Sequence, residues 1–162
     1  MIILVLITLA YCQGFKPNND ESYNIRNVAT SLYLSNILIK PTEWDDFDRH
    51  LYITNSKDET SEWGFILQNI TYNENRVYVI YNIFDNRCIT PKYHVHYANH
   101  VYLSDCNNIG TFQYWIIEEL GENRKRLKNY VEQMYLTSYN LDDLQIRENS
   151  IKAYQQWYIE LI

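Results

Sequence analysis

The chain has 162 residues, a net charge of −6 and 16 tyrosines, with only 4 glycines and 3 prolines. This length corresponds to one domain that can bury a hydrophobic core without a metal or many disulfides. The acidic balance argues against general nucleic-acid binding, which needs a basic surface. Tyrosine favours strands, and no long apolar pattern of helical period is present, so we expect an all-β protein.

The first predicted element is a secretory signal peptide over residues 1–12. Residues 2–10 are apolar but too few to span a bilayer, and Ala10 and Cys12 fit the small residues that precede a cleavage site. Gly14 offers another end for this segment, and a buried first strand is the alternative interpretation. The sequence therefore predicts a secreted, extracellular protein.

Removal of the signal peptide takes Cys12 away and leaves Cys88 and Cys106. Two cysteines in an exported chain suggest one disulfide bond. Export also makes Asn69, in the sequence Asn-Ile-Thr, a candidate for N-glycosylation. We therefore expect a glycoprotein with a single disulfide.

Three features recur along the rest of the chain in a constant order. The first is an asparagine six residues before a tyrosine or cysteine, in NVATSLYLS (27–35), NIFDNRCIT (82–90) and NYVEQMYLT (129–137). The second is an alternating apolar and polar segment, in HLYITN (50–55), HVYLSD (100–105) and DLQIRE (143–148). The third is a tryptophan followed by an apolar strand, at Trp63, Trp115 and Trp157. This recurrence indicates an internal repeat.

Each repeat is predicted to hold four short strands. The expected strands are 22–29, 31–36, 50–55 and 62–70, then 77–84, 87–91, 100–105 and 113–120, then 126–131, 133–138, 143–148 and 156–162. Three four-stranded units predict a β-trefoil, a closed barrel capped by hairpins, because closure pairs edge strands that would otherwise template aggregation. The expected organisation is a tail at 13–21 and one domain at 22–162, with repeats 22–70, 77–120 and 126–162.

The chain ends on the hydrophobic stretch AYQQWYIEL (153–161), which the repeat explains as the last strand of the trefoil. In a closed barrel this strand should pair with the start of the domain near 22–29. Because alternate side chains of a strand face opposite sides, Trp157 and Ile159 are expected in the core. Gln156 and Tyr158 are expected to face outward.

The second repeat resembles the ricin-type lectin repeat. Residues 87–115 run Cys, Ile, then Val-x-Leu-x-x-Cys, then Gln-x-Trp, and the third repeat ends on a second Gln-x-Trp while the first keeps only its Trp. The resemblance spans 23–162 and implies a β-trefoil whose two cysteines bridge within the repeat. The segment ENRVYVIYNIFDNRCIT (74–90) also resembles the trefoil half of moth low-molecular-weight haemolymph lipoproteins. The compact size and short signal peptide resemble secreted salivary trefoils of blood-feeding flies.

The ricin-type resemblance also implies where a sugar would bind. In that family an aspartate after the Cys-Leu pair accepts hydrogen bonds from the sugar, an aromatic ring stacks on it, and an Asn or Gln near the third strand completes the site. Here the aspartate position holds Ser35, Thr90 and Thr137, and the Gln position holds Tyr52, Tyr102 and Gln145. A hydroxyl cannot supply the charge-assisted bonds of a carboxylate. A surviving sugar site is therefore best placed at Thr137, Tyr139, Asn140 and Gln145.

Two stretches outside the repeat pattern are candidate ligand-binding segments. The loop 41–50 contains Trp44, Asp45, Asp46 and Phe47, and aromatics among charges are typical of binding hot spots. The alternative is that Trp44 and Phe47 plug the end of the barrel. The segment 123–128 contains Arg124, Lys125 and Arg126, a basic turn that suits an anionic surface, although a solvated connection between repeats is the alternative.

Histidines recur at His94, His96 and His100. In a strand the first two point to one face, so they suit a zinc ion, although an ordinary solvated face is the simpler interpretation. We assign no metal and no cofactor. Neither a glycine-rich phosphate loop nor a recognisable nucleophile signature is present in the sequence, so we expect a protein that is not an enzyme.

These observations predict a secreted, monomeric β-trefoil that binds rather than catalyses. The first hypothesis is an effector of salivary or haemolymph type that binds a host protein or small ligand through loop 41–50 and the basic turn. The second is a divergent carbohydrate-binding lectin. The third is a secreted storage or structural protein, which the high Asn and Tyr content would suit.

Overall fold

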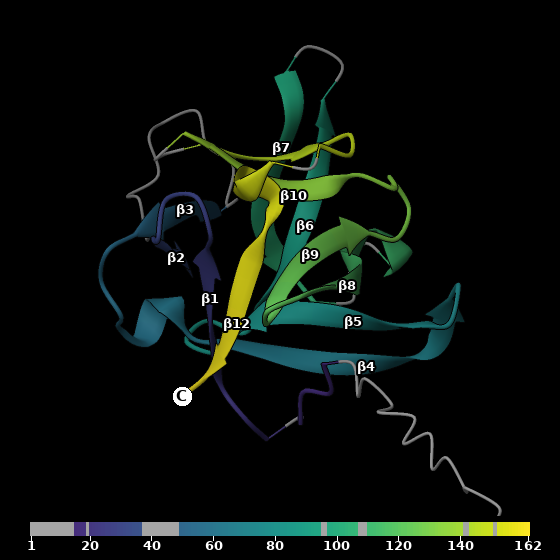
Figure 1. The fold of residues 1–162 in the computed structure, drawn as a ribbon, viewed down its shortest axis with the longest axis horizontal. Helices are drawn as coiled ribbons and strands as arrows, with labels where there is room; N and C mark the ends of the chain where they lie inside the picture. Colours follow the sequence, from purple (N-terminus) through teal and green to yellow (C-terminus); the bar gives the residue numbers. More distant parts are fainter. Residues whose placement is uncertain are drawn as a thin grey trace, which may run out of the picture.

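The structure is a computed structural model that describes residues 15–18, 20–36, 49–94, 97–106, 110–140, 143–150 and 152–162. The described chain consists of β-strands joined by turns and short 3-10 helices (Figure 1). The strands are β1 (Tyr23–Asn27), β2 (Tyr33–Asn36), β3 (Arg49–Thr54), β4 (Trp63–Tyr72), β5 (Asn75–Asn82), β6 (Arg87–His94), β7 (Tyr97–Asp105), β8 (Tyr114–Gly121), β9 (Arg124–Asn129), β10 (Tyr135–Asn140), β11 (Asp143–Arg147) and β12 (Trp157–Leu161). The 3-10 helices are η1 (Glu59–Ser61), η2 (Gly110–Gln113) and η3 (Ala153–Gln155).

The strands form a closed barrel with a cap of hairpins. The barrel runs β1–β12–β9–β8–β5–β4, and β4 returns to β1 through the pair Tyr23 and Trp63. The hairpins β2–β3, β6–β7 and β10–β11 contact one another through β3–β7 and β7–β11 and lie in the upper part of Figure 1. The predicted all-β fold, a β-trefoil of three four-stranded repeats, is confirmed.

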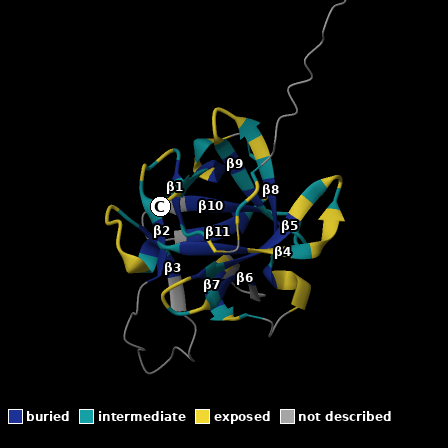
Figure 2. Cartoon of the chain, turned by 90° about the horizontal axis from the view of Figure 1, so that it is seen from below, coloured by how far each residue is buried: buried dark blue, intermediate teal, exposed yellow. Residues whose placement is uncertain are grey.

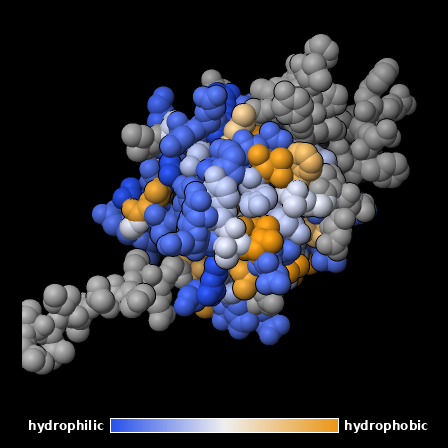
Figure 3. All heavy atoms as spheres, turned by 90° about the vertical axis from the view of Figure 1, so that its right-hand side faces the viewer, coloured by the Kyte–Doolittle hydropathy of each residue, from blue (hydrophilic) through white to orange (hydrophobic). Residues whose placement is uncertain are grey.

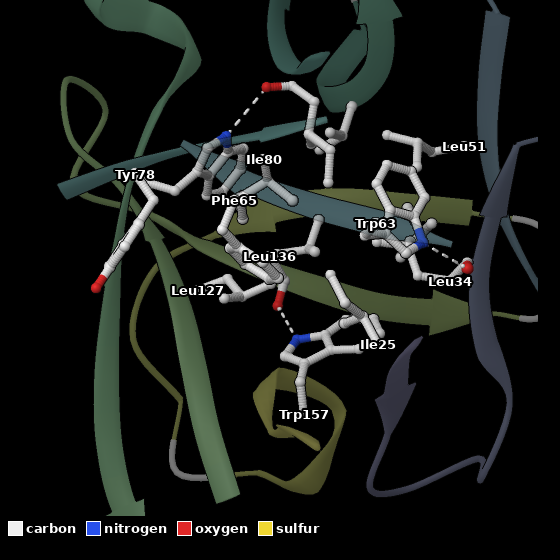
Figure 4. Close-up of a cluster of buried hydrophobic side chains, with 14 of the residues drawn as sticks. Ile25, Leu34, Leu51, Trp63, Phe65, Tyr78, Ile80, Leu127, Leu136 and Trp157 are labelled. Atoms are coloured by element: carbon white, nitrogen blue, oxygen red, sulfur yellow. Dashed lines mark hydrogen bonds between the residues drawn. The ribbon is translucent and has the colours of Figure 1, made fainter. Parts of the chain in front are cut away.

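The repeated tryptophans build the core. Trp63, Trp115 and Trp157 are fully buried, and each indole N–H donates to a carbonyl of the second strand of its own repeat. The acceptors are Leu34 O at 3.0 Å, Ile89 O at 3.0 Å and Leu136 O at 3.1 Å. Figure 4 shows the contacts of Trp63 with Leu34 and of Trp157 with Leu136. Each indole thus fills the centre and satisfies its one donor, as burial of tryptophan requires. Figure 2 shows the resulting arrangement, with buried residues along the strands and exposed residues at many of the turns.

The repeated asparagines join each repeat to the one before it. All three are completely buried, and their side-chain amides donate to carbonyls of the preceding 3-10 helix and of the residue after it. The closest contacts are Asn27 to Tyr154 O at 3.1 Å, Asn82 to Thr60 O at 2.9 Å and Asn129 to Phe112 O at 2.8 Å. Because Asn27 of the first repeat binds the third, the chain of contacts closes into a ring.

The two ends of the domain pair as predicted. Strand β1 is antiparallel to β12, with Ile25 opposite Ile159, and Trp157 is fully buried. The expectation that Gln156 faces outward is wrong, because its side chain is buried and its Oε1 accepts a hydrogen bond of 3.2 Å from the Arg124 guanidinium. The neighbouring strand β9 therefore covers a position that alternation alone assigns to solvent.

The predicted disulfide between Cys88 and Cys106 is present. At the position of Cys88 the other repeats carry Tyr33 and Tyr135. Lys57 lies over the first ring with its Nζ 5.0 Å from the centroid, and the Arg126 guanidinium lies over the second at 4.5 Å. In the first and third repeats a cation over an aromatic face thus takes the place of the disulfide of the second repeat.

Candidate functional site

The positions that hold an aspartate in ricin-type lectins lie inside this molecule. Ser35, Thr90 and Thr137 are all buried. The Thr90 hydroxyl donates to Cys88 O at 3.0 Å and accepts from Gln113 Nε2 at 3.1 Å. The glutamine of this Gln-x-Trp ending is therefore bonded to the threonine that replaces the lectin carboxylate.

The third repeat uses the same arrangement. The Thr137 hydroxyl donates to Tyr135 O at 2.8 Å and accepts from Gln155 Nε2 at 3.1 Å. In the first repeat, which lacks that glutamine, Ser35 Oγ lies 2.7 Å from Thr60 Oγ1. In all three repeats the hydroxyl bonds to the segment just before the tryptophan, so it serves the packing of its own repeat.

The residues predicted for a surviving sugar site are partly brought together. Thr137 of β10 lies directly opposite Gln145 of β11, as the sequence interpretation requires. Gln145 is buried, and its Oε1 accepts a 2.8 Å hydrogen bond from Arg147 Nε. The backbone of Tyr139 and Asn140 belongs to β10, while their side chains lie outside the described residues.

The basic segment forms a strand, and the expectation of a turn over 123–128 is wrong. Residues 124–128 belong to β9, and the turn before them is made by residues 121–123, all of which have positive φ. Each of the three predicted ligand-binding cations faces a carboxylate. The pairs are Arg124 with Glu122 at 3.0 Å, Lys125 with Glu119 at 3.4 Å and Arg126 with Glu118 at 2.7 Å.

The sequence predicted this strand only from residue 126, and its first residues were missed because Lys125 occupies a buried position in the alternation of β9. Its side chain is only 8% exposed, and its ammonium group lies 5.2 Å above the Phe15 ring. A lysine can bury its aliphatic stem in this way while the charged end finds a partner. These cations therefore already have carboxylate partners within the barrel wall.

The other predicted candidates lie mostly outside the described residues. Trp44, Asp45, Asp46 and Phe47 fall in the undescribed connection between β2 and β3. His96 and the side chain of His94 also fall outside, whereas His100 is described and exposed. Within the described ranges no group of three or more His, Cys, Asp or Glu side chains suits a metal ion. Asn69 is exposed in the β4–β5 hairpin, between Leu67 and Thr71, where the strand register shifts.

A cluster of tyrosines that the sequence interpretation missed lies where parts of all three repeats meet. Tyr72 of β4, Tyr114 of β8 and Tyr130 after β9 are half-buried and make edge-to-face contacts. The Tyr130 ring centroid is 5.9 Å from that of Tyr72 and 6.4 Å from that of Tyr114. We call these three residues the tyrosine cluster.

Two exposed apolar residues lie close to the tyrosine cluster along the chain, and a lysine contacts one of its rings. Phe112 and Val131 are each 39% exposed, and both are held by Asn129, which donates to Phe112 O and accepts from Val131 N. Lys128 places its Nζ 5.2 Å from the Tyr72 centroid. It has no carboxylate partner within ion-pair distance in the described part of the chain. Figure 3 views the side toward which the β4–β5 hairpin points, where orange and pale side chains gather among blue ones.

The tyrosine cluster breaks the threefold pattern of the fold. The positions of Tyr114 in the other repeats hold Glu62 and Gln156, and those of Tyr130 hold Val28 and Ile83. Features that the trefoil needs, such as the tryptophans and asparagines, occur in all three repeats. An aromatic group present at one junction of three is not required by the fold. It is therefore the best candidate in the described structure for a binding surface.

Comparison with known proteins places the chain among β-trefoils. No protein-family model and no curated protein sequence matches it. A salivary protein from Culex quinquefasciatus, of the Cysteine and Tryptophan-Rich family, is 17% identical, with a TM-score of 0.68 over 90% of this chain and 95% of that one. SeviL bound to asialo-GM1 saccharide is 20% identical, with a TM-score of 0.62 over 86% and 95%. The designed threefold-symmetric ThreeFoil is 14% identical, with a TM-score of 0.66 over 86% and 97%.

At these identities the similarity shows the fold. The resemblance to ricin-type and insect salivary trefoils is confirmed at that level. Among the described residues, no helix has the length and apolar character needed to cross a membrane.

Proposed function

We propose that this protein is a secreted binding protein, an effector of salivary type, that recognises a host protein. The observation that carries the proposal is the tyrosine cluster with its exposed neighbours Phe112 and Val131. Tyrosine supplies a large amphipathic contact area at low entropic cost and is enriched in interface hot spots. The salivary trefoil of similar fold supports the class of protein.

The charges near the tyrosine cluster indicate which charge the partner should carry. Lys128 borders the cluster without a carboxylate partner in the described chain, whereas Arg126 on the same strand is already paired with Glu118. A partner that places an acidic side chain beside an apolar one would match this surface. Loop 41–50 with Trp44 remains a second proposed contact, which the same experiment tests.

The experiment uses the mature protein in clotting and platelet assays. Phe112→Ala should reduce its potency by about thirtyfold, because a hot-spot truncation costs about 2 kcal/mol or more. Tyr154→Ala is the matched control, since Tyr154 holds the equivalent place before Trp157 and is 47% exposed. Trp44→Ala tests the loop in parallel. No activity in any assay, or equal losses for Phe112→Ala and Tyr154→Ala, would refute the proposal.

A lectin is the second candidate function. Thr137 faces Gln145 across β10 and β11, and a trefoil of similar fold carries a bound saccharide. Against it, both side chains are already hydrogen-bonded within the protein. Saturable binding on a glycan array that is lost in Gln145→Ala would favour the lectin over the effector.

A further inference from the structure

Phe15 closes the end of the barrel opposite the hairpin cap. Its ring makes edge-to-face contacts with Tyr23 at 5.6 Å and Phe65 at 5.4 Å, and its carbonyl accepts a 3.3 Å hydrogen bond from the Tyr78 hydroxyl. These partners belong to β1, β4 and β5, three strands of the barrel. In Figure 1 the purple segment before β1 runs beneath β4. Phe15 is therefore part of the folded domain, although it lies outside the repeats.

The backbone nitrogen of Phe15 contacts a carboxylate that is also paired with a lysine. It donates to Glu119 Oε1 over 2.7 Å. The other carboxylate oxygen of Glu119 is 3.4 Å from Lys125 Nζ, and that ammonium also lies over the Phe15 ring. Glu119 thus bridges a lysine and the nitrogen of Phe15. The Glu119 side chain is 33% exposed, so this carboxylate is partly shielded from water.

A carboxylate at this distance gives a stronger bond to an ammonium than to an amide N–H. The sequence before Phe15 offers small residues at Cys12 and Gly14, the spacing that a signal peptidase reads on the amino side of the cleaved bond. We propose that the chain is cleaved between Gly14 and Phe15, and that the new ammonium group of Phe15 forms an ion pair with Glu119.

The chemistry of the step is a hydrolysis. One water molecule is consumed, the peptide bond from Gly14 to Phe15 is broken, a carboxylate remains on Gly14 and an ammonium forms on Phe15 near neutral pH. A cut after Cys12 would leave Phe15 as an ordinary amide, and a cut beyond Phe15 would remove the ring that closes the barrel. Only the cut after Gly14 keeps the ring and places a full charge against Glu119.

The first test is the amino terminus of the protein secreted from a eukaryotic host, measured by intact mass and terminal sequencing. A start at Phe15 is expected. A start at Gln13, or at any residue after Phe15, would overturn the proposal.

The second test isolates the ion pair. Two forms released from a fusion partner, one starting at Phe15 and one at Gln13, are melted at about pH 6 and about pH 9.5, on either side of the usual α-amino pKa. At about pH 6 the form starting at Phe15 should melt about 2–4 °C above the form starting at Gln13, as about 1 kcal/mol gives for a protein of this size. At about pH 9.5, where the α-amino group is neutral, this difference should be lost. Glu119→Gln should remove this difference, whereas Glu122→Gln, the control, should leave it. A difference that survives Glu119→Gln would contradict the ion pair.

Discussion

Replacing Asn129 by alanine should destabilise the fold about twice as much as replacing Asn82. Both side chains are completely buried and occupy the same position of successive repeats. The Asn129 amide donates to Phe112 O and Tyr114 O, and its oxygen accepts from the N–H groups of Val131 and Glu132, at distances between 2.8 and 3.2 Å. Alanine removes all four hydrogen bonds at once.

Asn82 makes only half of these contacts. Its amide donates to Thr60 O at 2.9 Å and Glu62 O at 3.2 Å, while its Oδ1 has no partner among the described residues. With a net worth of about 1 kcal/mol for each hydrogen bond, Asn129→Ala should cost about 4 kcal/mol and Asn82→Ala about 2 kcal/mol. The difference arises because the turn after Asn82 does not present its N–H groups to the side chain.

Urea unfolding followed by tryptophan fluorescence measures both free energies of unfolding. Asn75→Ala is the control, because Asn75 lies at the tip of the β4–β5 hairpin and a surface change there should stay within about 0.5 kcal/mol. Equal losses for Asn129→Ala and Asn82→Ala, or a larger loss for Asn82→Ala, would refute the assignment of stability to these contacts.

Two further predictions concern the disulfide and the buried phenols. Reducing Cys88–Cys106, whose sequence separation is 18, should lower the free energy of unfolding by about 3 kcal/mol, and unchanged urea midpoints with and without reductant would argue against this value. Burial, the largest cause in each case, raises the pKa of Tyr23, Tyr78 and Tyr135 above the ordinary value of 10.0. The folded state therefore holds these protons while the unfolded state releases them, so stability should be complete below about pH 10 and fall as the pH rises above it. Ultraviolet titration of tyrosinate should show folded tyrosines ionising late, and Tyr78→Phe should make the alkaline loss shallower; titration of every tyrosine at its ordinary pKa would contradict the prediction.

The sequence by itself determined the features that every repeat must satisfy. Each repeat needs a tryptophan to fill the centre and an asparagine to bind the preceding 3-10 helix, so both residues recur in order and predict the trefoil. The pairing of the last strand with the first follows from the same pattern, because a closed barrel must join its ends. The disulfide follows instead from the two cysteines that remain in an exported chain.

Only the tertiary structure decided the features that depend on contacts between repeats. The sequence alone assigns Lys125 to a basic turn, whereas in the structure it contacts Glu119 and Phe15. The sequence alone also assigns Gln156 to the surface, whereas in the structure Arg124 covers it. The threonines that replace the lectin aspartate became structural once their glutamine partners were seen.

The tyrosine cluster is the clearest example of a feature that the sequence alone does not reveal. Tyr72, Tyr114 and Tyr130 come from three different repeats, and each follows an ordinary strand pattern in the sequence. Phe15, likewise, lies ahead of the repeats and reaches its place only when the barrel is formed. Local patterns specify which side chains a repeat buries, whereas the surfaces made between repeats depend on the closure that brings distant residues together.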